Sequence, residues 1–427
     1  MARRVLFYSH DTLGLGHIRR CLAIASSLAS RIEDVSILIV SASSAAGSFH
    51  LPPGVDILKI PSIRKLGNGR YASRSLDGSS DDVRNLRAGI LRETLRAFTP
   101  DVIYVDKDPL GPLGELSEIL EENRAARALG EGAITLLGLR DILDDPEAVC
   151  REWEARGTIR AIDKLYDRVL VYGMREVYDL GLEYNFPESL LNKMEYVGYI
   201  DPRERDGEGH VSVGWDGGRR RVVVTAGGGE DGFALFSSYL RAARILEKRF
   251  SLESTIVLGP DFPAASAEAV DLLASELAHP VYVVRFAEEM AHYVRAADLV
   301  VSMAGYNTVS EILAYGKKAV VVPRVQPRRE QLLRAERLAS RGLVSFVHPD
   351  ALTVQSFSDA LAKALAEGVE PRPHAGVDLG GLDRTALLVA EILNAARDEG
   401  AASIDLSDSA RCHEVIARSA AERAHVR

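Results

Sequence analysis

Short apolar runs alternate with segments of helical periodicity along almost the whole chain, and this alternation limits the possible folds more than any other feature. Strands that alternate with helices build parallel sheets, and two separate sets of runs predict an α/β protein with two doubly wound, Rossmann-like domains. The candidate strands are 5–9, 35–40, 55–60, 102–105, 134–139 and 168–172 in the first half, and 221–226, 254–258, 281–285, 299–302, 319–322 and 344–347 in the second.

The chain length supports two domains. A chain of 427 residues exceeds one ordinary core and suits two domains of about 200 residues each. We predict an N-terminal domain at 1–200, a polar, glycine-rich linker at 201–220, a second domain at 221–397 and a polar tail at 398–427. Ligands of open parallel sheets bind beyond the carboxyl ends of the strands, so two such domains facing each other would share one cleft.

Composition excludes several classes of protein. A hydrophobic fraction of 47% and a charged fraction of 26% are typical of a soluble globular enzyme. The three cysteines lack metal or redox spacing, the N-terminus is too short and polar for a signal peptide, and no apolar run is long enough to span a membrane. These features predict a cytoplasmic protein. The net charge of −9 argues against a nucleic-acid partner.

The segment 298–316 carries the clearest functional pattern. The apolar run ends at Ser302, Gly305 follows, and a helix then opens with Thr308 and Glu311 three residues apart. A glycine at the start of a helix lets phosphates approach backbone N–H groups that have no intrahelical partner. The Glu311 carboxylate can accept hydrogen bonds from both ribose hydroxyls. Together they predict a nucleotide-sugar site.

This pattern, Ser-x-Ala-Gly-x-x-Thr-x-x-Glu, continues into Gly316-Lys317 and an apolar strand that ends at Pro323. It resembles the donor-site signature of GT-B glycosyltransferases, and the most similar members are of the MurG type (family 28-like), which transfer N-acetylglucosamine from its UDP form to a lipid-linked sugar. The resemblance covers most of the second half, from 219 to 342, and more weakly residues 1–40. It implies a hexosyltransferase with the GT-B fold, a UDP-sugar donor, inversion without a metal, no cofactor, and a lipid-linked or otherwise anionic acceptor.

The first loop is predicted to hold the acceptor. Gly14 and Gly16 permit a tight turn and His17 falls at the helix start, although Gly-x-Gly alone fits any Rossmann-like first turn. In the family this loop is also glycine-rich and ends in Gly-His. The resemblance therefore implies that His17 takes the proton from the acceptor hydroxyl, with His10 and Asp11 as alternative bases. A capping or packing histidine is the other interpretation.

Asp106-Lys107-Asp108 follows a predicted strand. Asp-x-Asp in this place is the metal motif of the other large glycosyltransferase class, GT-A, because two carboxylates can hold a divalent ion against a diphosphate. Here the motif lies far in sequence from the nucleotide signature, whose helix dipole can itself hold phosphates. We therefore predict no metal and an acceptor-side role, in which Asp106 orients His17.

Three more segments belong to the donor site by resemblance. Gly227 and Gly228 precede a helix and face the diphosphate, although the adjacent carboxylates of Glu230 and Asp231 would repel it. Phe286 and Ala287 frame the nucleobase, with a core phenylalanine as the alternative. Glu330 and Gln331 hydrogen-bond to the sugar hydroxyls. Arg334 stands where the family more often has asparagine, which favours a sugar other than N-acetylglucosamine.

The segment 83–98 combines an apolar side with arginines at 84, 87, 92 and 96. A basic amphipathic helix can bind an anionic membrane surface, which predicts peripheral contact with the inner face of the membrane. Packing on its own sheet is the alternative. Two rival functions also stay open: a UDP-sugar epimerase on the same fold, and a non-catalytic nucleotide-sugar-binding protein. A nicotinamide dehydrogenase is disfavoured, since neither domain has the full glycine fingerprint.

Overall fold

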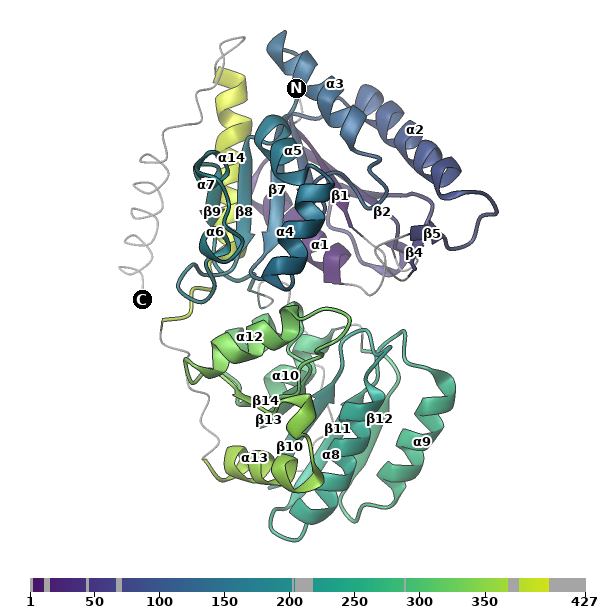
Figure 1. The fold of residues 1–427 in the computed structure, drawn as a ribbon, viewed down its shortest axis with the longest axis vertical. Helices are drawn as coiled ribbons and strands as arrows, with labels where there is room; N and C mark the ends of the chain where they lie inside the picture. Colours follow the sequence, from purple (N-terminus) through teal and green to yellow (C-terminus); the bar gives the residue numbers. More distant parts are fainter. Residues whose placement is uncertain are drawn as a thin grey trace.

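The computed structural model describes residues 3–10, 16–43, 46–66, 71–201, 203, 218–287, 289–367 and 376–398. Two α/β domains lie one above the other, each with a parallel sheet between helices (Figure 1). Most of the predicted linker 201–220, nearly all of the tail 398–427, and the predicted acceptor residues Asp11 and Gly14 lie outside the described residues.

The first sheet has seven strands in the order β3-β2-β1-β6-β7-β8-β9, and every neighbouring pair is parallel. The order reverses direction between β1 and β6, which is where open sheets of this kind bind ligands. The bounds are β1 Arg3–Ser9, β2 Val35–Ser41, β3 Val55–Lys59, β6 Val102–Asp106, β7 Ile134–Arg140, β8 Arg168–Tyr172 and β9 Met194–Tyr196.

The second sheet has six parallel strands in the order β12-β11-β10-β13-β14-β15, with the corresponding reversal between β10 and β13. Its strands are β10 Arg220–Thr225, β11 Leu252–Val257, β12 Val281–Val284, β13 Leu299–Ser302, β14 Ala319–Val321 and β15 Ser345–Phe346. A separate antiparallel hairpin joins β4 Ile63–Lys65 to β5 Tyr71–Ser73.

These sheets confirm the predicted fold class. The twelve apolar runs became strands because their β-branched side chains pack between helix layers: Val222 to Val224 in β10, for example, are at most 1% exposed. The helices are α1 Gly16–Arg31, α2 Ser80–Phe98, α3 Ser117–Ala128, α4 Pro146–Ala155, α5 Thr158–Leu165, α6 Leu180–Glu183, α7 Glu188–Leu191, α8 Phe233–Leu246, α9 Ala264–Ser275, α10 Met290–Ala296, α11 Tyr306–Ala314, α12 Glu330–Ala339, α13 Val354–Ala366 and α14 Gly381–Asp398.

The last helix, α14, differs from the predicted domain boundary. The prediction placed 221–397 in the second domain, whereas α14 packs against α1 of the first domain (Figure 1). Asp383 pairs there with Arg31, and Asn394 accepts a hydrogen bond of 2.6 Å from Arg3. Leu382 and Val389 are buried in a core cluster that includes α1. The first domain is therefore built from both ends of the chain.

The chain thus crosses between the domains twice, and the two crossings are joined. Ile200 and Gly380 form an antiparallel bridge. The Tyr199 N–H donates to Asp378 at 2.9 Å, and the Gly381 N–H donates to the Tyr199 carbonyl at 3.1 Å. A Cβ on Gly381 would lie 2.4 Å from a backbone oxygen, so glycine is needed for this approach.

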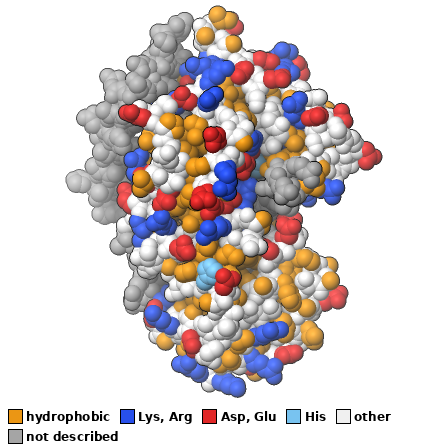
Figure 2. All heavy atoms as spheres, in the orientation of Figure 1, with side chains coloured by type: hydrophobic (Ala, Val, Ile, Leu, Met, Phe, Trp, Pro, Cys, Tyr) orange, Lys and Arg blue, Asp and Glu red, His pale blue; other side chains and the backbone are white. Residues whose placement is uncertain are grey.

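Helix α2 bears on the predicted membrane contact. Its buried Val83 and Leu91 pack on the sheet, and Arg87 is fully buried against Glu115 at 2.6 Å. On the outside Arg92 pairs with two glutamates of α3, so less free positive charge is available than the sequence indicated. On the face drawn in Figure 2, basic and acidic side chains are interspersed. The membrane contact stays a prediction; no helix of the described residues is long and apolar enough to cross a bilayer.

Candidate functional site

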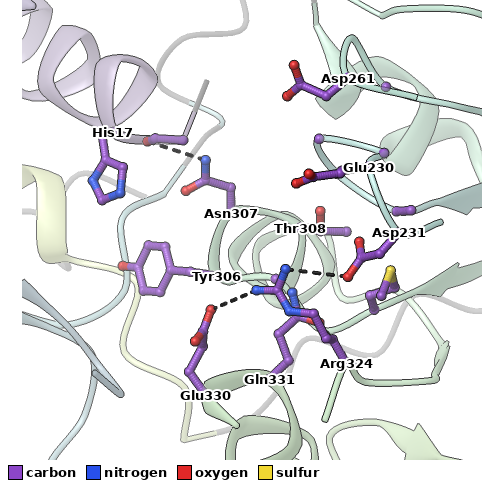
Figure 3. A pocket seen from close by; sticks show the side chains of 18 of the residues that line it. His17, Glu230, Asp231, Asp261, Tyr306, Asn307, Thr308, Arg324, Glu330 and Gln331 are labelled. Atoms are coloured by element: carbon purple, nitrogen blue, oxygen red, sulfur yellow. Dashed lines mark hydrogen bonds and ion pairs between the residues drawn. The ribbon is translucent and has the colours of Figure 1, made fainter. Parts of the chain in front are cut away.

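A cleft of about 1000 Å³ lies where the carboxyl ends of the two sheets face each other (Figure 3). It is lined by most of the predicted site residues: His10, Gly16, His17, Gly227, Gly228, Phe286, Ala287, Gly305, Thr308, Glu311, Glu330 and Gln331. Residues almost 300 positions apart in sequence meet here, since the Asn307 side chain donates to the Gly16 carbonyl at 3.5 Å. The two domains therefore contribute to one site.

His17, at the start of α1, is held by Asp106 at the end of β6. The two side chains are 2.5 Å apart, Nδ1 to Oδ2, and are 11% and 1% exposed. An ionised carboxylate can only accept, so Nδ1 carries the proton and Nε2 is the nitrogen that can take up another. The predicted orientation of His17 by Asp106 fits this geometry.

Arg20, one turn further along α1, completes the arrangement and was not predicted. Its guanidinium donates to both Asp106 oxygens at 2.7 and 2.8 Å and lies 5.3 Å from the ring centre of Tyr172. It also lies 5.7 Å from the ring centre of Tyr306, the first residue of α11. Arg20 therefore joins the His17 pair to the start of the donor-domain helix.

The electrostatics keep His17 neutral and Asp106 ionised. Burial lowers the pKa of His17 to about 3, and the attraction of Asp106 opposes this only in part. Burial alone would raise the pKa of Asp106, but Arg20 and then His17 overcome that effect and lower it to about 2. At neutral pH the site therefore holds an unprotonated imidazole beside a carboxylate, which is the state a general base requires.

His10 lies against His17, with ring centres 5.2 Å apart and an edge-to-face orientation. It is 3% exposed, and its Nδ1 has no hydrogen-bond partner in the described part of the chain. Burial, followed by repulsion from Lys107 and His17, lowers its pKa well below the ordinary value. No carboxylate among the described residues pairs with it as Asp106 pairs with His17. The geometry therefore favours His17 over His10 as the base.

On the opposite wall, α11 begins at the end of the cleft as predicted. Gly305 is the N-cap residue and has no side chain, so no side chain of the described residues caps the helix and the first N–H groups of α11 can bind a ligand. A Cβ at Gly305 would meet no atom of the described residues within 4 Å, so these residues leave space in front of it. Thr308 and Glu311 follow on α11 and both line the cleft. Ser302 instead lies buried beneath this loop, outside the cleft lining, where its Oγ accepts from the Ala304 N–H at 3.4 Å.

The glycine loop after β10 faces the same space. Gly227 has a positive φ of 71° and room for a ligand beside it. The sequence predicted that Asp231 would repel phosphate, but Arg324, which the sequence analysis missed, lies 3.4 Å from the Asp231 carboxylate. Arg324 also lies 3.4 Å from Glu330, and Figure 3 shows both pairs.

Phe286 and Ala287 lie at the end of β12. Phe286 is 45% exposed and lines the cleft, so the alternative interpretation as a core side chain is wrong. The Ala287 carbonyl accepts a hydrogen bond of 3.3 Å from Arg19 of the first domain. Arg19 therefore adds an inter-domain contact where the nucleobase is predicted to lie.

Glu330 and Gln331 open α12 below the cleft. The Gln331 side-chain oxygen accepts from the Arg324 N–H at 3.0 Å, which leaves its amide N–H groups for a ligand. Glu330 is 5% exposed, and its Oε2 has no hydrogen-bond partner within the residues that the structure describes. Burial would raise the pKa of Glu330, but Arg140, Arg334 and Arg324 together lower it, so the carboxylate is ionised.

Arg334 does not line the cleft; it lies behind Tyr306, with its guanidinium 5.8 Å from the centre of that ring. Its guanidinium is fully buried, donates to Asp141 of the first domain at 2.7 and 2.9 Å, and donates to the Ala304 carbonyl at 3.0 Å. Arg334 therefore gives no support to the expectation of a sugar other than N-acetylglucosamine, which stays a prediction.

The carboxylates of Asp106 and Asp108 point to different partners. Arg20 and His17 engage Asp106, whereas Arg156 lies 3.2 Å from Asp108. Among the described residues no group of three or more His, Cys, Asp or Glu is placed to hold a metal ion.

Comparisons with known proteins agree with this geometry. The glycosyltransferase family 28 C-terminal domain matches residues 222–375. A UDP-N-acetylglucosamine–N-acetylmuramyl-(pentapeptide) pyrophosphoryl-undecaprenol N-acetylglucosamine transferase of Agrobacterium fabrum is 31% identical over 141 residues, which is 33% of this chain and 37% of the relative. The chain thus matches little more than a third of that relative's length.

Solved structures match over nearly the whole chain. MurG of Acinetobacter baumannii superposes with a TM-score of 0.57 at 15% identity, over 91% of this chain and 99% of the other. The UDP-GlcNAc 2-epimerase of Neisseria meningitidis has a TM-score of 0.58 at 14% identity, over 92% and 100%. Likeness at such low identity shows the fold alone.

The fold and the facing strand ends therefore define a GT-B protein. Its second domain is similar to the C-terminal domain of glycosyltransferase family 28, and the resemblance to the MurG type that the sequence indicated is confirmed.

Proposed function

We propose that the protein is a glycosyltransferase that moves a hexosyl group from a nucleoside-diphosphate sugar, a UDP-sugar, to an acceptor hydroxyl with inversion. The observation that carries the proposal is the placement of the His17–Asp106 pair across one cleft from the uncapped start of α11. One wall supplies a neutral base and the other supplies free N–H groups for a diphosphate.

In the proposed reaction the acceptor oxygen attacks the anomeric carbon while the bond from that carbon to the diphosphate oxygen breaks. The acceptor proton goes to His17 Nε2, and the diphosphate leaves with the bonding electrons. The N–H groups at the start of α11 stabilise the charge that develops on the leaving group. Glu311 binds the ribose, and Glu330 with Gln331 orients the sugar.

The same contacts support metal independence, which is part of the proposal. The Asp-x-Asp carboxylates are already engaged by Arg20, His17 and Arg156, and the α11 start and glycine loop offer the phosphates an alternative. Glycosyl transfer in the presence of excess EDTA tests this part of the proposal, and full dependence on added Mg²⁺ would contradict it.

The function is tested by titrating the protein with UDP, GDP and TDP conjugates in a calorimeter, then incubating the best donor with and without candidate acceptors. A transferase is supported if the wild type binds the donor and the His17→Ala variant still binds the donor but no longer catalyses turnover. Epimerisation of the donor without any acceptor supports the rival epimerase. Donor binding with no turnover of any kind supports a binding protein.

A further inference from the structure

Three cationic side chains on the cleft wall take no part in the proposed reaction. Lys107 follows β6, Arg140 ends β7, and Arg328 lies in the loop before α12; all three line the cleft. Lys107 is adjacent in sequence to Asp106, and its N–H donates to the Gly138 carbonyl of the neighbouring strand at 2.8 Å. Two of the three cations therefore come from adjacent strand ends of the first domain, beside His17.

The backbone at Lys107 is held in a strained turn. The Asp108 N–H donates to the Asp106 carbonyl at 3.0 Å across Lys107, whose φ is +74°. This is the geometry of a γ-turn with positive φ, which is rare for a residue other than glycine. Such strain is concentrated at functional sites, where the surrounding structure enforces it.

These three cations are partly exposed in the cleft, and among the described residues they lack the close carboxylate partner that each buried arginine has. Arg20, Arg87 and Arg334 each meet a carboxylate at 2.6 to 2.7 Å. In contrast, neither the Lys107 ammonium nor the Arg140 guanidinium has a hydrogen bond or ion pair with any residue that the structure describes. Arg328 reaches Asp144 only at 3.7 Å, and Asp144 also accepts from the Arg329 N–H.

The electrostatics agree with this geometry. Burial, followed by repulsion from Arg140 and Arg328, lowers the pKa of Lys107 well below its ordinary value, and Glu330 and Asp108 offset this only in part. Burial likewise lowers the pKa of Arg140. An anionic ligand would relieve this repulsion and provide the missing partner.

We propose that Lys107, Arg140 and Arg328 form a subsite for an anionic oxygen group, a phosphate or carboxylate, carried by the acceptor beside the hydroxyl that His17 activates. The donor diphosphate has its own place at the start of α11 on the opposite wall, whereas Lys107 and Arg140 belong to the domain that carries the base. The subsite rests on the proposed function, since it assumes that this wall receives an acceptor.

The probe is inorganic phosphate, titrated by calorimetry into the full chain saturated with UDP, so that the donor diphosphate site is filled. Phosphate should bind to the wild type, and Lys107→Gln and Arg140→Gln should each weaken it by about tenfold or more, the usual effect of losing a charge-assisted hydrogen bond. The affinity for UDP should stay unchanged. Arg84→Gln, on the exposed side of α2, is the matched control and should change neither affinity.

Thermal melting in phosphate-free buffer separates a binding role from a structural one. Because Lys107→Gln removes an unrelieved repulsion and no hydrogen bond, its Tm should equal or exceed that of the wild type. A Tm several degrees lower would show a structural role and would overturn the proposal. So would weaker UDP binding in Lys107→Gln, since the lysine would then hold the donor phosphates.

Two further outcomes are decisive. If Lys107→Gln selectively weakens UDP-glucuronate relative to UDP-glucose, the anion belongs to the donor sugar and the acceptor assignment is wrong. If UDP does not bind at all, the proposed function fails by itself. Phosphate bound by the free protein and lost in Lys107→Gln would still uphold the anion subsite in that case.

Discussion

The buried pair of Arg334 and Asp141 gives the sharpest test of how the two domains are held together. Arg334→Met removes a guanidinium whose side chain is 0% exposed, together with its hydrogen bonds of 2.7 and 2.9 Å to Asp141 and 3.0 Å to the Ala304 carbonyl. The Asp141 carboxylate then stays buried without its ion-pair partner.

The magnitude follows from what Asp141 retains. Breaking a buried ion pair from one side costs about 3–5 kcal/mol. The Ile142 N–H still donates to Asp141 at 2.9 Å and the Tyr199 hydroxyl at 3.4 Å, so we expect the lower end, about 3 kcal/mol. Replacing both partners, Asp141→Leu with Arg334→Met, removes the unpaired charge and should recover part of that loss.

The measurement is urea unfolding followed by circular dichroism and fluorescence, whose transitions must coincide before a free energy is extracted. Arg337→Met is the matched control, because Arg337 also reaches the first domain from α12 but pairs with Glu183 in a 44% exposed setting. Its loss should cost at most about 1 kcal/mol. If Arg334→Met lowers the free energy of unfolding no more than Arg337→Met does, the buried pair does not hold the domains together.

Three other predictions concern the cleft. The pKa of His17 is lowered to about 3 from an ordinary 6.5, so between these pH values the unfolded chain binds a proton that the native protein does not. The free energy of unfolding should therefore fall as the pH drops from 6.5 towards 3. Urea midpoints measured from pH 7 to pH 4 should fall less steeply in His17→Gln than in the wild type. Asp106→Asn should lower kcat by about 100-fold or more while UDP affinity stays within twofold by calorimetry, and an unchanged kcat would dismiss the orienting role of Asp106. Gly305→Ala introduces a Cβ into open space at an ordinary φ of −62°; it should leave the Tm unchanged but weaken UDP binding about tenfold, and equal affinities would place the diphosphate elsewhere.

Local patterns in the sequence were enough to predict both sheets. Strands β8 and β13 have the predicted bounds; in β13 the apolar run Leu299–Val301 begins after a charged residue and ends at the polar Ser302. Strand β9 and the β4–β5 hairpin were missed, since strands of three residues are too short to leave an apolar run. Helix α14 was placed in the wrong domain because its apolar face gives no sign of which sheet layer it covers.

The site shows the same division. Glycines and helix starts have local signatures, so the sequence singled out Gly305, Glu311 and His17, and all three line the cleft. Arg20 and Arg324 were missed, because arginines on a helix or loop look like solvated charges until the tertiary fold shows their carboxylate partners. Arg87 shows the largest difference between sequence and structure. The sequence predicted that its side chain contacts a membrane surface, whereas it is buried inside the first domain.

The paired crossings at Tyr199–Ile200 and Gly380–Gly381 have a practical consequence for dissecting the protein. A fragment that stops at residue 200 would leave the apolar side of α1 bare, because α14 normally shields it. A faithful isolated first domain would instead need residues 3–200 spliced to 376–398. Because the two crossings are hydrogen-bonded to each other, the domains cannot rotate about one crossing alone. Separation of the domains has to bend both crossings together.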